Sequence, residues 1–227
     1  MARTNIVKLS SVEVKSKAAA PQQRNVVIKP PRFEVATVRI RGVSPYVQNA
    51  FGEKAMNTMI ETQKAGHQAK KGRAREPKDF KAAYENATYR SRQGWCGIPA
   101  AAFRNAMISA CRTVGFKMTL AKLSLFVEAD GFDDKSGTPL VKIVKGQPHE
   151  SVLPVRLMNG STDIRIRPMW NEGWEAQVRV RWDAEQFSAS DMMNLMARVG
   201  MQVGLGEGRP DSKNSSGQGW GLFEIVN

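Results

Sequence analysis

A strict alternation between residues 174 and 182 constrains the fold of this chain more than any other feature of its sequence. The apolar positions are Trp174, Ala176, Val178, Val180 and Trp182, and the polar positions between them are Glu175, Gln177, Arg179 and Arg181. Because successive side chains of a strand point to opposite faces, this segment is predicted to be a strand with one buried and one polar face. Such a strand fits an antiparallel sheet that is covered on one side.

The segment before it repeats the pattern. Its apolar residues are Ile164 and Ile166, and they alternate with Arg165 and Arg167. Asn171-Glu172-Gly173 supplies turn-forming residues between the two segments, so we predict a hairpin that pairs 162–169 with 174–182.

Residues 33–42 also alternate and are predicted to be the first strand, with Arg39 and Arg41 on its polar face. If this strand joins the same sheet, six arginines share one face with few carboxylates to neutralise them. Arginines across from each other repel, and a phosphate backbone relieves this because guanidinium groups pair with phosphate oxygens and stack on bases. The alternative is an ordinary solvated sheet face.

The remaining elements complete an α+β domain. Further strands are predicted at 123–128, 140–144 and 222–226, and helices at 52–65, 100–114 and 189–203. The strongest of these elements follow one another in the order βαββαβ.

The charge of the chain is concentrated in two stretches. The net charge is +13. Residues 1–32 hold seven basic residues and one acidic residue, and residues 64–81 hold seven basic and two acidic residues. Together the two stretches carry 11 of the 13 excess positive charges. We predict a flexible basic arm over 1–31 and a single domain over 32–227 with a mobile basic insertion at about 64–81, which contains Lys70, Lys71, Arg73 and Arg75. An anionic partner is expected, and the mobile stretches suit a polyanion.

Few residues suggest a metal, a cofactor or catalysis. Cys96 and Cys111 lack metal-ligand spacing, and His67 and His149 have no legible partner. We therefore expect a non-enzymatic binding protein without cofactor or metal, although a metal-independent RNA endonuclease stays open as a lesser alternative. The sequence shows no long apolar run and no signal peptide, so a cytoplasmic protein without a membrane partner is expected.

Two further features suit nucleic-acid binding. A glycine-rich segment lies between the last helix and the last strand, and it contains Gly206, Gly208, Arg209 and Trp220. Glycines let backbone amides approach a ligand or a neighbouring chain closely. Aromatic residues also lie beside arginines, as Tyr89 and Trp95 do beside Arg90 and Arg92, which suits stacking on bases.

These segments resemble a known family. The helix that ends in a glycine-rich loop before a final strand, over 189–226, is similar to the C-terminal signature of the repeat-associated mysterious protein (RAMP) superfamily, and Gly97-Ile98-Pro99 with the helix that follows resembles its first loop and helix. The chain also looks like uncharacterised phage proteins with a glycine-rich C-terminal loop. The resemblance implies a ferredoxin-like, RRM-related antiparallel sheet with two packed helices, and an RNA-gripping role in CRISPR complexes.

The main hypothesis from the sequence is a single-stranded DNA- or RNA-binding protein. It would assemble as a homo-oligomer along the strand, in phage replication or recombination or in a CRISPR-like complex. The rival hypothesis is a virion or assembly protein whose basic arm contacts nucleic acid without strand preference.

Overall fold

Most of the chain between residues 28 and 226 is described by the computed structural model. The described residues are 28–50, 59–61, 63–64, 79–156, 160, 162–212 and 218–226. Those from Pro31 onward belong to one compact unit. Residues 1–27 of the predicted arm, most of the predicted helix at 52–65 and the four basic residues Lys70, Lys71, Arg73 and Arg75 lie outside the described residues.

The described elements include six successive strands between two of the helices. In order they are β1 (Phe33–Gly42), β2 (Tyr46–Val47), α2 (Phe80–Ala87), β3 (Gly97–Pro99), α3 (Ala100–Thr113), α4 (Met118–Ser124), β4 (Leu125–Glu128), β5 (Gly131–Phe132), β6 (Pro139–Lys145), β7 (His149–Arg156), β8 (Thr162–Trp170), β9 (Glu175–Asp183), α5 (Ala189–Arg198), the π-helical turn η1 (Val199–Val203) and β10 (Phe223–Val226).

The main sheet is antiparallel and has β1 and β9 at its centre. Its strands follow the order β10-β1-β9-β6-β3, with β4 also paired to β9 and β5 to β6. The elements β1, α3, β4, β9, α5 and β10 therefore form a βαββαβ unit whose strands lie in the order β10-β1-β9-β4, which is the ferredoxin-like arrangement. The predicted α+β fold class is confirmed.

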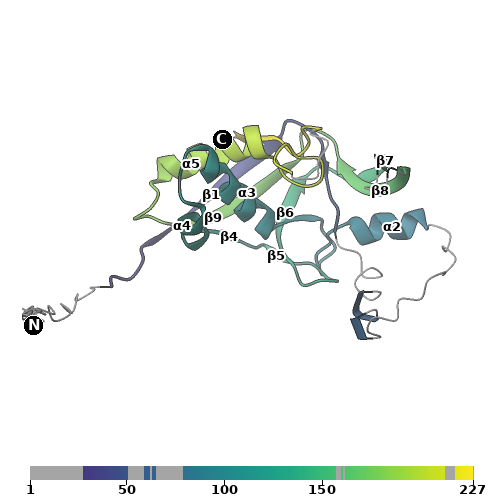
Figure 1. The fold of residues 1–227 in the computed structure, drawn as a ribbon, viewed down its shortest axis with the longest axis horizontal. Coiled ribbons are helices and arrows are strands. Elements are labelled where there is room, and N and C mark those ends of the chain that lie inside the picture. The colour runs from purple at the N-terminus through teal and green to yellow at the C-terminus, as the bar shows by residue number, and fades with distance from the viewer. Residues whose placement is uncertain are drawn as a thin grey trace, which may run out of the picture. The chain divides into compact units, whose positions relative to one another are not determined.

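Helices cover one face of this sheet. Val38 on β1 and Val178 on β9 belong to the same buried cluster as Phe103 on α3 and Met196 on α5. In Figure 1, α3, α4 and α5 lie over the strands of the main sheet. The alternation in β9 has the predicted consequence, because Ala176, Val178, Val180 and Trp182 are buried while the residues between them, from Gln177 on, are exposed or half-buried.

We refer to the opposite side of the main sheet as the open face. On β1 it bears Val35, Thr37, Arg39 and Arg41, which are all exposed. Within the described part of the chain, no helix packs on these side chains. The open face is the surface that the sequence alternation marked as polar.

The predicted hairpin of 162–169 with 174–182 is wrong. β8 belongs to a second, three-stranded sheet of order β2-β8-β7, and β7 and β8 extend together beside α2 (Figure 1). The connection after Trp170 instead leads into the main sheet, where Gly173 N donates to Gly42 O at 2.8 Å. β9 has no free edge for β8, because β1 lies along one side of it and β4 and β6 lie along the other.

Other boundaries differ in smaller ways. The segment predicted as a strand from residue 123 begins with the end of α4, and the strand itself starts at Leu125. The last predicted helix is α-helical only to Arg198 and continues as the π-helical turn to Val203. Ser188 caps α5, in a capping box with Asp191.

Candidate nucleic-acid interface

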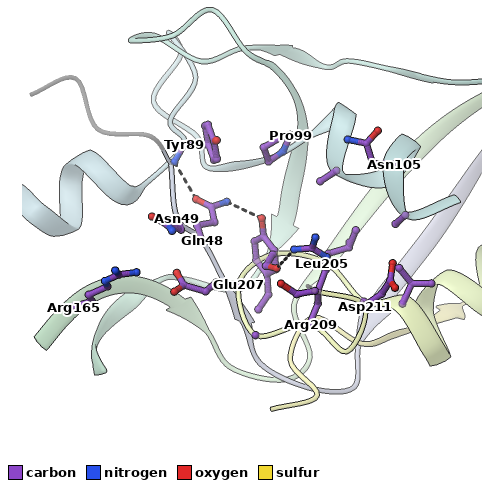
Figure 2. Close-up of a pocket in the computed structure, with 18 residues that line it drawn as sticks. Gln48, Asn49, Tyr89, Pro99, Asn105, Arg165, Leu205, Glu207, Arg209 and Asp211 are labelled. Atoms are coloured by element: carbon purple, nitrogen blue, oxygen red, sulfur yellow. Dashed lines mark hydrogen bonds between the residues drawn. The ribbon is translucent and has the colours of Figure 1, made fainter. Parts of the chain in front are cut away.

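A pocket of about 560 Å³ lies where the glycine-rich loop faces α3 and β2. We call this the loop pocket. Its walls come from β2 and the residues after it, from the first two turns of α3, from β8 and from the loop that follows η1 (Figure 2). The lining residues are Tyr46, Gln48, Asn49, Tyr89, Pro99, Ala102, Asn105, Ala106, Arg165, Val203, Gly204, Leu205, Gly206, Glu207, Gly208, Arg209, Asp211 and Ser212.

The loop is held against β2 by backbone contacts that only glycine permits. Gly206 has φ +76°, and a Cβ there would lie 2.3 Å from the carbonyl oxygen of Val47. The next residue, Glu207, donates its N–H to the same oxygen at 2.9 Å. The loop therefore follows β2 closely and forms one wall of the pocket.

Trp220 supports this wall from behind. A Cβ on Gly208 would lie 2.4 Å from the Trp220 ring, so the glycine lets the loop rest on the indole. Trp220 N donates to Gly208 O at 3.2 Å, and Leu205 N donates to Gly221 O at 3.0 Å. The ring is half-exposed. The two ends of the glycine-rich segment thus meet in one layered loop, and some of its glycines serve packing.

The start of α3 forms the facing wall. Pro99 occupies the N-cap position and gives no side-chain hydrogen bond to the helix, and Ala102 and Asn105 follow it along the pocket. The free N–H groups at a helix N-terminus carry partial positive charge and favour anions. This end of the pocket therefore favours a phosphate or a carboxylate.

The charged side chains of the pocket are unequally paired. Glu207 accepts from Arg167 Nε at 2.7 Å, and Asp211 accepts from Arg112 Nη2 at 2.7 Å and from Ser109 Oγ. Arg209 donates to Gly206 O at 2.9 Å. Among the described residues, neither Arg165 nor Arg209 has a carboxylate partner. Both lining carboxylates are thus already neutralised, and the charge left for a ligand is positive.

Buried Gln48 joins the walls together. Its Nε2 donates to the Tyr46 hydroxyl at 3.3 Å, and its Oε1 accepts from Tyr89 N at 3.0 Å (Figure 2). The same Nε2 also donates to Gly97 O at 2.7 Å. Burial raises the pKa of Tyr46, so the phenol stays protonated. Gln48 ties the residues after β2 to the segment that leads into α3. Sequence reasoning missed this residue, because a lone glutamine after a two-residue strand has no periodic signal.

The predicted site residues that the structure describes are divided among three surfaces. Gly206, Gly208, Arg209 and Arg165 meet at the loop pocket, whereas Arg39, Arg41, Arg179 and Arg181 lie on the open face of the main sheet. Because β8 is in the other sheet, the expectation that all six arginines share one surface is wrong. Arg90 and Arg92 lie on a third surface, near β5, where Arg90 is 3.8 Å from Glu85 and Arg92 N donates to Phe132 O.

The expectation of few neutralising carboxylates on the open face is also wrong. Arg39 and Arg41 both bind Glu175, at 2.7 and 3.3 Å. Arg179 lies 3.6 Å from Glu128 and 3.4 Å from Asp130.

The guanidinium group of Arg181 makes cation–π contacts with two aromatic rings. It lies 5.1 Å from the Phe33 ring centroid and 5.0 Å from that of Phe126. Three of the tryptophans lie in the core and are not available to a ligand. Trp174 and Trp182 are in the core as predicted, and Trp170 is buried as well.

No cluster of three or more histidine, cysteine, aspartate or glutamate side chains within the described ranges is placed to hold a metal ion. No helix in this part of the chain is long and apolar enough to cross a membrane.

Comparisons with known proteins give structural likeness but no match by sequence. No protein-family model and no curated protein matches the chain. A chain of the solved structure described as the cryo-EM structure of the Type III-B Cmr-beta bound to cognate target RNA is similar, with 12% sequence identity and a TM-score of 0.49. The match covers 86% of this chain and 59% of that chain, so this chain spans less than two thirds of its neighbour's length. The fold assignment rests on the strand order described above.

Proposed function

We propose that this protein binds single-stranded nucleic acid and that the loop pocket holds a phosphate of the strand. The observation that carries the proposal is the convergence, in one pocket, of the N-terminus of α3 with Arg165 and Arg209, neither of which has a carboxylate partner among the described residues. A net charge of +13 supports a polyanionic partner.

The shape of the pocket favours a single strand over a duplex. A volume of about 560 Å³ lies in the range of sites that hold small molecules, and its aromatic lining suits bases that are not paired. Tyr89 lines the pocket and is half-exposed, and Trp220 is half-exposed behind the loop. Unpaired bases can stack on such rings, which adds about 1–3 kcal/mol per stacked base.

The test is fluorescence anisotropy with matched single- and double-stranded DNA and RNA at two or more salt concentrations. We expect tighter binding to single strands. The double variant Arg165→Gln with Arg209→Gln should weaken binding and reduce the slope of log K against log salt by about 0.7 for each lost phosphate contact. Arg198→Gln, on the exposed side of α5, is the control for a change of charge alone.

Two outcomes would contradict the proposal. Equal affinity for duplex and single strand would remove the strand preference and favour a general assembly role. If the double variant lost no more affinity per charge than Arg198→Gln, the loop pocket would not be the contact site.

A further inference from the structure

The open face of the main sheet carries three basic side chains around one carboxylate. Glu175, at the start of β9, accepts from Arg39 Nη2 at 2.7 Å and Nε at 3.1 Å through Oε2. Its Oε1 accepts from Lys145 Nζ at 3.0 Å and from Arg41 Nε at 3.3 Å. The cations come from β1 and β6, the two strands beside β9, so the register of the sheet fixes their positions. We call these four residues the Glu175 cluster.

The carboxylate of the cluster lies beneath its cations. The Glu175 side chain is 1% exposed, whereas those of Arg39, Arg41 and Lys145 are 49%, 45% and 64% exposed. The three cationic side chains are therefore accessible to solvent, whereas the Glu175 carboxylate beneath them is almost inaccessible.

The cluster has more positive charge than its carboxylate requires. A buried carboxylate needs pairing to offset desolvation, but one arginine and a few hydrogen bonds supply that. Hydrogen bonds from Arg39, Lys145 and Arg41 hold the pKa of Glu175 at about 2, so it is ionised at neutral pH. Among the described residues, one other carboxylate pairs with these cations: Glu224, which is 53% exposed and lies 3.9 Å from Arg41. Three cations face two carboxylates even when Glu224 is counted, and only Glu224 is open to solvent.

We propose that Arg39, Arg41 and Lys145 form a second phosphate-binding surface, for the backbone of a nucleic acid, and that Glu175 is the positioning residue that holds them ready. This surface lies on the open face, whereas the loop pocket is built on α3 and the glycine-rich loop. The inference rests on the proposed nucleic-acid binding and extends it to a surface with its own residues. A preorganised cluster loses less side-chain entropy on binding than three free side chains would.

Removal of the negative charge of Glu175 distinguishes a positioning role from simple electrostatic repulsion of the strand, because the two predict opposite changes in affinity. Glu175→Gln and Glu224→Gln each remove one negative charge from the same face. Attraction alone would make both variants bind a single strand as tightly as the unmodified protein or more tightly. If Glu175 positions the cations, Glu175→Gln should instead weaken binding at least about threefold, as expected for the loss of one or more ordered phosphate contacts, while Glu224→Gln should not weaken it.

The experiment measures anisotropy with a labelled single strand, after thermal melting has shown which variants fold. A folded Glu175→Gln variant with unchanged or tighter binding would overturn the proposal and leave the cluster a structural role. If this variant does not fold, Lys145→Gln decides, with the exposed Lys122 of α4 as its charge-matched control. Lys145→Gln should weaken binding about threefold more than Lys122→Gln and lower the salt slope by about 0.7, and equal effects of the two would overturn the proposal.

This test can fail separately from the proposed function. If the unmodified protein binds no nucleic acid, both ideas fall. If it binds and the Arg165 and Arg209 double variant weakens binding while the Glu175 cluster variants do not, only the second surface is refuted.

Discussion

At the scale of single residues, glycine is where the sequence alone misleads most easily. Gly206 and Gly219 both have positive φ, at +76° and +73°, yet their surroundings differ. A Cβ on Gly206 would meet Val47 O and the Tyr46 ring, while a Cβ on Gly219 would meet no atom within 4 Å. Sequence reasoning treated the glycines of this loop alike, because the contact that distinguishes them comes from β2, about 160 residues earlier.

This difference gives a prediction with an internal control. Gly219→Ala should lower the free energy of unfolding by about 1 kcal/mol, which is the cost of the left-handed backbone for a residue with a Cβ. Gly206→Ala should cost that amount and about 1–3 kcal/mol more, since the loop must move away from β2. Chemical denaturation of the two variants measures the difference. Equal losses would show that the loop is not pressed against Val47.

At the scale of elements, local signals predicted what local forces determine. β1 at Phe33–Gly42, the start of α3 after Pro99 and the cap of α5 at Ser188 were all readable, because alternation, proline and capping act within a few residues. The partner of β8 was not readable. It depends on β1, β4 and β6 occupying both sides of β9, and these are contacts between segments that are distant in the sequence.

The residues of the candidate site were likewise predictable only where the signal was local. The sequence identified Gly206, Gly208 and Arg209, but it did not place Arg165 with them and it missed Gln48. Buried Glu175 was assigned to the polar face correctly, yet its role in pairing Arg39 and Arg41 required the register of β1 against β9.

The cap of α5 provides a prediction at this scale. Ser188 Oγ accepts from Asp191 N at 3.1 Å, and Asp191 accepts in return from Ser188 N at 3.0 Å. Ser188→Ala should therefore lower the free energy of unfolding by about 1 kcal/mol. Ser190→Ala, at an exposed position of the same first turn, should leave it unchanged or raise it slightly, since alanine is the better helix former. A loss of similar size from Ser190→Ala would show that the effect does not come from the cap.

At the scale of the whole molecule, two proposed phosphate-binding surfaces on one small domain bear on assembly. A domain of this size covers only a few nucleotides, so coverage of a long strand requires repeated copies. The stretches 1–32 and 64–81 contribute most of the net charge, and they add long-range attraction to the polyanion. We therefore expect a homo-oligomer that forms along a single strand, whose phosphates offset the repulsion between copies that each carry +13.

Light scattering and electron microscopy test this expectation. They should show small particles without nucleic acid, and particles that grow with the length of the strand when a strand is added. High salt should reverse the growth, because the screening length falls from about 8 Å at physiological ionic strength to about 3 Å at 1 M. Particles that stay monomeric at saturating strand would contradict this expectation, and assembly of equal size without any nucleic acid would favour the virion or assembly protein instead.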